Sequence, residues 1–107
     1  MKISELEKTI KIKIYSDETE GEINGVYVCD LLSRAMSKIS PGDLWITIQN
    51  NVNTVAVAEL TEAAVVVFPE GIIPADDVIK TASDKEIVIA SSPMSAYEIC
   101  LAIGNVL

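Results

Sequence analysis

The sequence predicts an α/β fold, with a mostly parallel but mixed β-sheet flanked by helices. Four strand-like stretches begin near residues 26, 44, 64 and 86, and a helix-like stretch follows each. Connections through helices favour parallel strands with right-handed crossovers. Two strands, 64–68 and 87–90, are almost wholly apolar, which is typical of central strands covered on both faces. An alternating stretch, 10–14, precedes the four units and would make the sheet mixed.

Length and composition favour one domain over residues 1–107. Half of the residues are hydrophobic but only 5% are aromatic, so the core must be mainly aliphatic. Sixteen acidic and eight basic residues give a net charge of −8, which disfavours nucleic acid and anionic lipid as partners. The start lacks an apolar signal region, and the longest apolar run, 63–68, is too short to span a bilayer. We therefore expect a cytoplasmic protein.

The first quarter of the chain predicts a helix, a strand and a charged turn. Ser4–Glu7 has a capping-box pattern, which marks a helix start. Residues 10–14 alternate isoleucine with lysine, as in a half-buried strand whose lysines protect a sheet edge. The acidic stretch 17–22 is typical of a solvated turn. Through this turn, we expect the strand at 10–14 to pair antiparallel with the strand at 26–29.

The remaining chain predicts four strands, each followed by a helix. Asp30 can cap the first of these helices, Asp76 and Asp77 suit the first turn of the third, and Gly104 suits the end of the last. The expected strands are 26–29, 44–48, 64–68 and 86–90, and the expected helices are 31–38, 52–62, 74–83 and 95–103.

Four polar turns follow the predicted parallel strands, and parallel strands place such turns at one edge of the sheet. The stretch 42–60 illustrates the pattern, because a strand, an uncharged polar turn and a small-residue helix follow one another. Backbone N–H groups and helix dipoles at this edge favour a phosphate or a carboxylate. The candidate ligand-binding residues are Asp30, Gln49, Asn50, Asn51, Glu70, Gly71, Ser91, Ser92 and Ser95.

The same turn residues also have structural explanations. One of Asn50, Asn51 and Asn53 can cap the following helix, with another in a left-handed backbone conformation. Gly71 can serve a tight turn. For any single residue, capping explains the pattern better than ligand contact does. The convergence of four polar turns is what favours a binding site.

The usual catalytic and metal-binding patterns are missing from the sequence. It contains no histidine, no cysteine pair at zinc spacing and no glycine-rich phosphate loop. A carboxylate pair made of Asp30 and Glu70 is the one acid/base arrangement left open. Cys29 and Cys100 lie in apolar stretches and are expected to be reduced thiols. We expect no cofactor and no metal.

The last predicted helix has a recognisable start and two apolar faces. Ser95 and Glu98 form a capping-box pattern, and Met94 can pack against Ile99 as a hydrophobic staple. At helical spacing, the core stripe consists of Ala96, Ile99, Cys100 and Ile103. Exposed apolar patches often mark subunit contacts. We therefore predict a homodimer with candidate interface residues Met94, Tyr97 and Leu101, although a helix covered on both sides would explain the pattern equally well.

Three stretches resemble the DRTGG domain family, which is named for an Asp-Arg pair after one strand and Thr-Gly-Gly after the next. They are Pro-Gly-Asp-Leu-Trp-Ile-Thr at 41–47, Val-Val-Val-Phe-Pro-Glu-Gly-Ile-Ile-Pro at 65–74 and Ile-Val-Ile-Ala-Ser-Ser-Pro-Met-Ser-Ala-Tyr at 87–97. The signature itself is altered, because the Asp-Arg position holds Asn50 and Asn51 and only Gly71 of Thr-Gly-Gly is kept.

The resemblance covers nearly the whole chain and implies an α/β fold like the N-terminal domain of HPr kinase/phosphorylase, without kinase activity. It also implies a regulatory or dimerising module of the kind that accompanies nucleotide-sensing CBS modules in pyrophosphatases, or phosphotransacetylases. We therefore predict a non-enzymatic regulatory or interaction module with a homodimeric or partner-enzyme contact. The first alternative is a sensor of a nucleotide or small phosphorylated metabolite, and the second is a small enzyme using Asp30 and Glu70.

Overall fold

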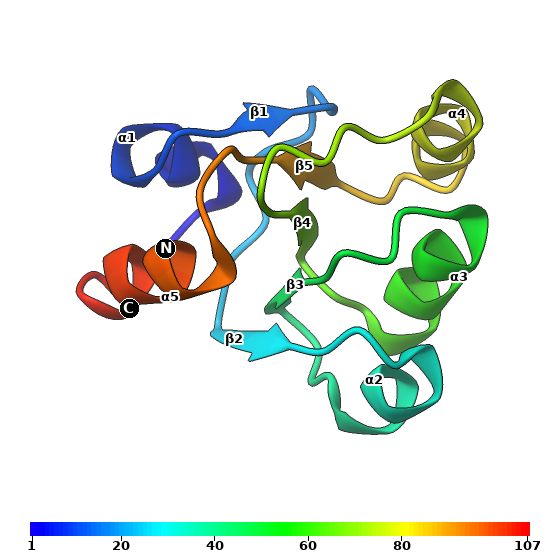
Figure 1. Ribbon diagram of the computed structural model, residues 1–107, viewed down its shortest axis with the longest axis horizontal. Helices are drawn as coiled ribbons and strands as arrows, with labels where there is room; N and C mark the ends of the chain where they lie inside the picture. The colour runs from blue at the N-terminus through cyan, green and yellow to red at the C-terminus, as the bar shows by residue number, and fades with distance from the viewer.

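A five-stranded mixed sheet forms the centre of the computed structural model, which describes residues 1–107 (Figure 1). The strand order is β1-β5-β4-β3-β2. Strands β2 to β5 are parallel, and β1 pairs antiparallel with β5. The predicted fold class is therefore confirmed. The strands are β1 (Lys13–Ile14), β2 (Gly25–Val28), β3 (Asp43–Ile46), β4 (Val65–Phe68) and β5 (Ile89–Ser91).

Helices cover both faces of the sheet, but unequally. Figure 1 places α2, α3 and α4 on one side, and α1 and α5 on the other. Every helix predicted for the four strand–helix units is present, with no end displaced by more than two residues. The helices are the 3-10 helix η1 (Ile3–Glu5), α1 (Leu6–Thr9), α2 (Leu32–Lys38), α3 (Val52–Thr61), α4 (Asp76–Asp84) and α5 (Ala96–Gly104).

Two hydrophobic cores lie on the two sides of the sheet, and β4 contributes to both. Val65 and Val67 pack with Ile99 and Ile103 of α5 in one core. Val66 and Phe68 pack in the other core, beneath α2, α3 and α4. All four β4 residues are fully buried, as expected for an apolar strand covered on both faces. The prediction that this strand is central is confirmed.

The predicted pairing of the N-terminal strand with β2 is wrong. β1 pairs with β5, at the opposite edge of the sheet. The segment between β1 and β2 runs beside the N-terminus, where Ile3 donates to the carbonyl of Gly21 and Ile23 donates to that of Met1. This path buries both Ile3 and Ile23 in the core beneath α5, which a tight hairpin from β1 to β2 would not allow. β2 is consequently an outermost strand.

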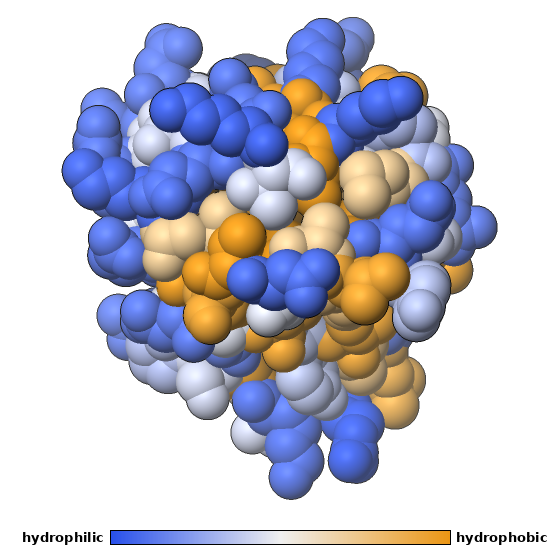
Figure 2. All heavy atoms as spheres, turned by 90° about the vertical axis from the view of Figure 1, so that its left-hand side faces the viewer, coloured by the Kyte–Doolittle hydropathy of each residue, from blue (hydrophilic) through white to orange (hydrophobic).

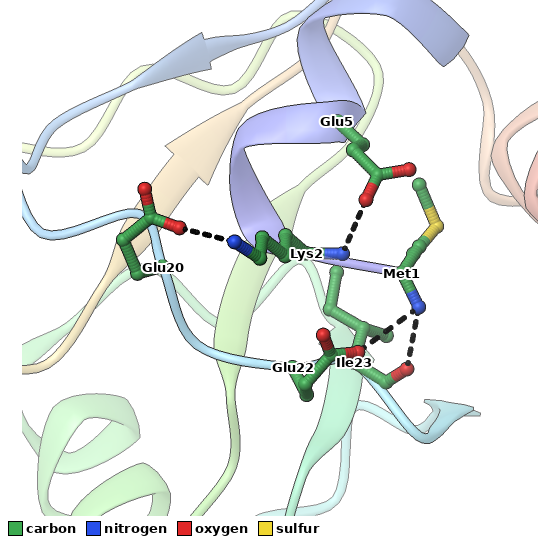
Figure 3. Close-up of polar contacts among 6 residues, drawn as sticks. All are labelled: Met1, Lys2, Glu5, Glu20, Glu22 and Ile23. Carbon is green, nitrogen blue, oxygen red and sulfur yellow. Dashed lines mark hydrogen bonds and ion pairs between the residues drawn. The ribbon is translucent and has the colours of Figure 1, made fainter.

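Polar contacts also hold the N-terminal residues against this segment (Figure 3). The Met1 ammonium lies 3.3 Å from the Glu22 carboxylate, and the Lys2 ammonium lies 2.9 Å from Glu20, which raises the pKa of Lys2. The backbone N–H of Lys2 donates to Glu5 at 3.1 Å. Glu5 therefore caps the helical start, and the predicted capping box of Ser4 and Glu7 is wrong by two residues.

Three glutamates adopt the left-handed backbone conformation that was expected of an asparagine. These are Glu62, Glu70 and Glu86, with φ of 59°, 60° and 58°, whereas no asparagine has a positive φ. Glu62 ends α3, where its N–H donates to the carbonyls of Ala58 and Glu59. The helix end requires this conformation, and a residue with a β-carbon is strained in it.

The two cysteines are free thiols, as predicted, and they pack against different cores on opposite sides of the sheet. Burial raises the pKa of the Cys100 thiol, which favours its protonated form. None of the helices combines the length and apolar composition needed to cross a bilayer.

Replacing Glu62 with glycine should raise the free energy of unfolding by about 1 kcal/mol, because glycine adopts positive φ without strain. Urea unfolding followed by circular dichroism measures the change. Glu7→Gly is the matched control, because Glu7 lies in α1, where glycine should destabilise. A loss of stability in Glu62→Gly would contradict the strain at this position.

Candidate functional site

The turns that follow the four parallel strands lie at one edge of the sheet, as predicted. This edge is called the carboxyl edge below. It comprises the connections from β2 to α2, β3 to α3, β4 to α4 and β5 to α5. All nine candidate ligand-binding residues lie in it, counting Ser91 at the end of β5. What distinguishes a binding site from a set of helix caps is whether their polar groups remain free.

Asp30 connects two of these turns instead of capping a helix. Its Oδ1 accepts hydrogen bonds from the Thr47 hydroxyl at 3.0 Å and from the N–H of Ile48 at 2.9 Å. The predicted cap of α2 is wrong, because the N-cap position is Leu31 and no side chain caps it. Thr47 is buried, so its hydroxyl needs a partner, and Asp30 is the acceptor that the fold places there.

The turn between β3 and α3 is a dense set of internal hydrogen bonds. Asn51 caps α3 by accepting from the N–H groups of Asn53 and Thr54, which confirms one of the predicted caps. The Thr54 hydroxyl donates to the carbonyl of Gln49 at 2.6 Å. Asn50 donates its Nδ2 to the carbonyl of Ile73 at 2.9 Å, while its Oδ1 is buried without a partner. The orphaned Asn50 oxygen is the one side-chain acceptor that this turn leaves unused.

The turn after β4 is bonded to the turn after β5. Glu70 and Gly71 both have positive φ, and Ile72 donates back to the carbonyl of Pro69 at 3.2 Å, so the predicted tight turn at Gly71 is confirmed. The N–H of Glu70 donates to Met94 and that of Gly71 donates to Ser92, both at 2.9 Å. These two backbone donors are therefore already paired within the fold.

The serines of the last turn are likewise engaged. Ser91 shares a hydrogen bond with the Tyr15 hydroxyl, and the Ser92 hydroxyl donates to the carbonyl of Lys11 at 2.6 Å. Ser95 caps α5 in the predicted capping box, and its hydrogen bonds lower the pKa of Glu98. These three side chains hold β1 and α5 in place at the carboxyl edge.

Neither of the two hollows on the surface is formed by the candidate ligand-binding residues. The larger, of about 900 Å³, lies between the end of β1 and the loop before β5, and includes Lys13, Tyr15 and Glu86. The smaller, of about 490 Å³, lies between α1 and the start of α5, where Met94 and Glu98 contribute. Binding by the nine residues therefore stays a prediction, and it would have to occur on an open surface.

The chemistry of the carboxyl edge is that of acceptors. Asp30 and Glu70 bring carboxylates, and Asn50 brings its unpartnered oxygen. Two cations lie near this edge: Arg34 is in the first turn of α2, and Lys11 contacts Ser92 through its carbonyl. No group of three or more metal-ligating side chains is close enough together to hold a metal ion.

Comparison with solved structures finds a similar fold, whereas the comparisons by sequence find nothing. No family model and no curated protein matches the sequence. The fold matches the crystal structure of the CBS and DRTGG domains from the regulatory region of the Clostridium perfringens pyrophosphatase, in complex with the activator diadenosine tetraphosphate. The TM-score is 0.74 at 16% identity, over 94% of this chain. The chain has a DRTGG-like fold.

The match covers 45% of the clostridial chain, so this chain spans less than half the length of its neighbour. In the DRTGG-like fold, the two turns that resemble the altered family signature belong to neighbouring strands, β3 and β4. The hydrogen bond from Asn50 to Ile73 joins these two connections directly. The sequence had placed both turns correctly but could not show that they bind each other.

The predicted exposure of one face of α5 is confirmed. Tyr97 is 73% exposed and Leu101 55%, whereas Ile99 and Ile103 are fully buried. Met94 packs partly against the core beneath α5. Figure 2 shows apolar side chains gathered across the middle of the face that carries α1 and α5. Their use as a subunit contact stays a prediction.

Sequence reasoning missed two groups of residues. Thr47, directly after β3, and Thr54, in the first turn of α3, supply hydroxyls that fix the turns of the carboxyl edge. The only signal of Thr47 was a polar residue at a strand end, and Thr54 had none. Val28, Leu31 and Met36 are exposed apolar residues near β2. No local pattern marks them, because their exposure follows from the strand order.

Replacing Asp30 should separate a structural role from an acid/base role. Asp30→Ala leaves the buried Thr47 hydroxyl and the Ile48 N–H without their acceptor, so we expect a loss of about 1–3 kcal/mol in unfolding free energy. Asp30→Asn keeps an oxygen acceptor and should cost much less. Thermal unfolding of both variants, with Glu70→Ala as an exposed control, tests this. Equal losses in Asp30→Ala and Asp30→Asn would contradict it.

Proposed function

We propose that this chain is a non-enzymatic regulatory module that acts as a homodimer through the exposed side of α5. The observation that carries this proposal is the composition of α5. Glu98 is the one charged residue in nine, and the helix exposes Tyr97 and Leu101 although it is apolar nearly all round. Helices of this kind are normally buried on more than one side. A second copy would supply the missing cover.

The geometry of the carboxyl edge supports a module rather than an enzyme. Catalytic groups must be free to exchange protons or to contact substrate. One oxygen of Asp30 instead accepts hydrogen bonds from Thr47 and Ile48. The backbone donors at Glu70 and Gly71 are paired within the fold. The turns behave as one rigid surface. An enzyme based on Asp30 and Glu70 therefore has less support than a binding or contact surface.

Charge supports self-association through this side in particular. A chain with a net charge of −8 repels its own copies except where the touching surfaces carry few charges. The exposed side of α5 comes close to such a surface, because its large side chains, Tyr97 and Leu101, are uncharged and Glu98 is its one carboxylate. Two such surfaces can meet in an isologous contact, in which each copy uses the same patch.

Leu101→Arg should convert a dimer into a monomer without unfolding the chain, because Leu101 is 55% exposed and arginine can extend into water. Light scattering after size-exclusion chromatography at micromolar concentration measures the mass. Leu60→Arg is the matched control, since Leu60 is 70% exposed on α3 and should not affect assembly. A monomeric mass for the unmodified chain would refute the homodimer.

A nucleotide-sensing role is the second candidate, favoured by the diadenosine tetraphosphate in the structure of the clostridial neighbour. The carboxyl edge is the proposed site, with Asn50 and Gly71 at its centre. A ligand there would meet the carboxylates of Asp30 and Glu70, and the backbone donors at Glu70 and Gly71 are already used. A nucleobase or ribose fits this chemistry better than a phosphate does.

If the chain is a nucleotide sensor, diadenosine tetraphosphate, ATP or AMP should raise its melting temperature. A ligand at about 100 times its Kd adds about 2.7 kcal/mol to the free energy of unfolding. Differential scanning fluorimetry measures the shift. Asn50→Ala should abolish it, and Asn105→Ala, at the far end of α5, should not. The absence of a shift with all three nucleotides would remove nucleotide sensing and leave the regulatory module.

A further inference from the structure

One edge of the sheet, at β2, has no further strand paired with it. β2 is the last strand in the order, and Figure 1 shows no further strand beyond it, with α2 to one side. The predicted neighbour of β2 lies instead beside β5, so the outer side of β2 is left open. Unpaired N–H and C=O groups on a strand edge are a template for another strand.

The direction of the free groups follows from the pairing with β3. The N–H of Cys29 donates to the carbonyl of Ile46 in β3. Backbone groups alternate in direction along a strand, so Tyr27 also faces β3, whereas Val26 and Val28 face outward. No turn or side-chain hydrogen bond in the structure uses the backbone of Val26 or Val28.

The two edges of the sheet differ in their protection. β1 has two paired residues, and its exposed Lys13 and the neighbouring Lys11 place positive charges beside that edge. Charged residues on an edge prevent unwanted pairing. β2 contains Gly25-Val26-Tyr27-Val28, with no charge and no proline. Only one edge of this sheet is therefore open to a further strand.

Apolar side chains flank the open edge on both sides of the sheet. Val26 packs against the core that lies beneath α5, and Tyr27 packs against the core that lies beneath α2, α3 and α4. Val28 is itself 49% exposed. The exposed large apolar residues of β2, α2 and α5, together with the residue before α2, are Val28, Leu31, Met36, Tyr97 and Leu101.

We propose that β2 is the seam of the homodimer: β2 of one copy pairs antiparallel with β2 of a second copy, and the two five-stranded sheets become one. This inference rests on the proposed self-association and names its surface. In the register centred on Tyr27, Val26 faces Val28 of the second copy, and about four backbone hydrogen bonds form. The strand meets its own sequence, as an isologous contact requires.

The antiparallel pairing of the two β2 strands brings no like charges together, and it is compatible with a contact through α5. In this register Asp30 lies opposite Asn24 of the second copy, so no carboxylate opposes a carboxylate. A two-fold axis perpendicular to the sheet keeps both α5 helices on one side, where Tyr97 and Leu101 close over the seam. The lysines beside β1 stop the joined sheet from growing further.

Hydrogen exchange tests the seam directly. In the dimer, the amides of Val26 and Val28 should exchange at least about tenfold more slowly than in the Leu101→Arg monomer. The Tyr27 amide, which faces β3, should be protected in both states and serves as the internal control. Exchange is read residue by residue by NMR, at protein concentrations above and below the dissociation constant of the dimer.

Val28→Lys provides a second test, because an edge lysine should oppose strand pairing, whereas Val28→Thr keeps the β-branched shape without charge. We expect a monomeric mass for Val28→Lys and a dimeric mass for Val28→Thr. If the chain is dimeric but the Val26 and Val28 amides exchange equally in dimer and monomer, the β2 seam is overturned and the homodimer stands. A monomeric unmodified chain would overturn both.

Discussion

Burial of β4 on both faces is the constraint on which the rest of the structure depends. Val65 and Val67 point to one core, Val66 and Phe68 point to the other, and all four are fully buried. A strand of this kind must have neighbours on both edges and helices on both faces, or it would expose apolar surface to water. β3 and β5 supply the edges, and the helices on each side supply the cover. The positions of the other elements follow from this demand.

A consequence of that arrangement is that the turns of the carboxyl edge are bonded to one another. Asp30 joins the first turn to the second, Asn50 joins the second to the third, and the N–H groups of Glu70 and Gly71 join the third to the fourth. A surface whose polar groups are mutually satisfied is rigid and presents few groups for chemistry. This is why the same residues that look like a ligand site in sequence support a contact module in the structure.

The position of the candidate site could be predicted from the sequence, but the hydrogen-bond partners of its residues could not. A polar turn after each parallel strand locates the carboxyl edge, and helix signals such as Ser95 with Glu98 and the asparagines before α3 identify caps. Whether Asp30 caps α2 or accepts from Thr47 depends on where β3 ends relative to β2, which is a property of register. The left-handed backbone at three glutamates could not be predicted from the sequence either. Asparagine and glycine are the residues that prefer this conformation, and the fold imposes it on glutamate.

The sequence by itself determined the fold class, the helices and strands of the four repeating units and the exposure of Tyr97 and Leu101, because each depends on periodicity within a short stretch. Only the tertiary structure decided where the N-terminal strand goes. Its alternation of lysine with isoleucine suits either edge of the sheet equally. The burial of Ile3 and Ile23 beneath α5 decides the edge, and both residues lie outside the strand. That choice places β1 beside β5 and leaves β2 open, with its outward amides at Val26 and Val28 unpaired.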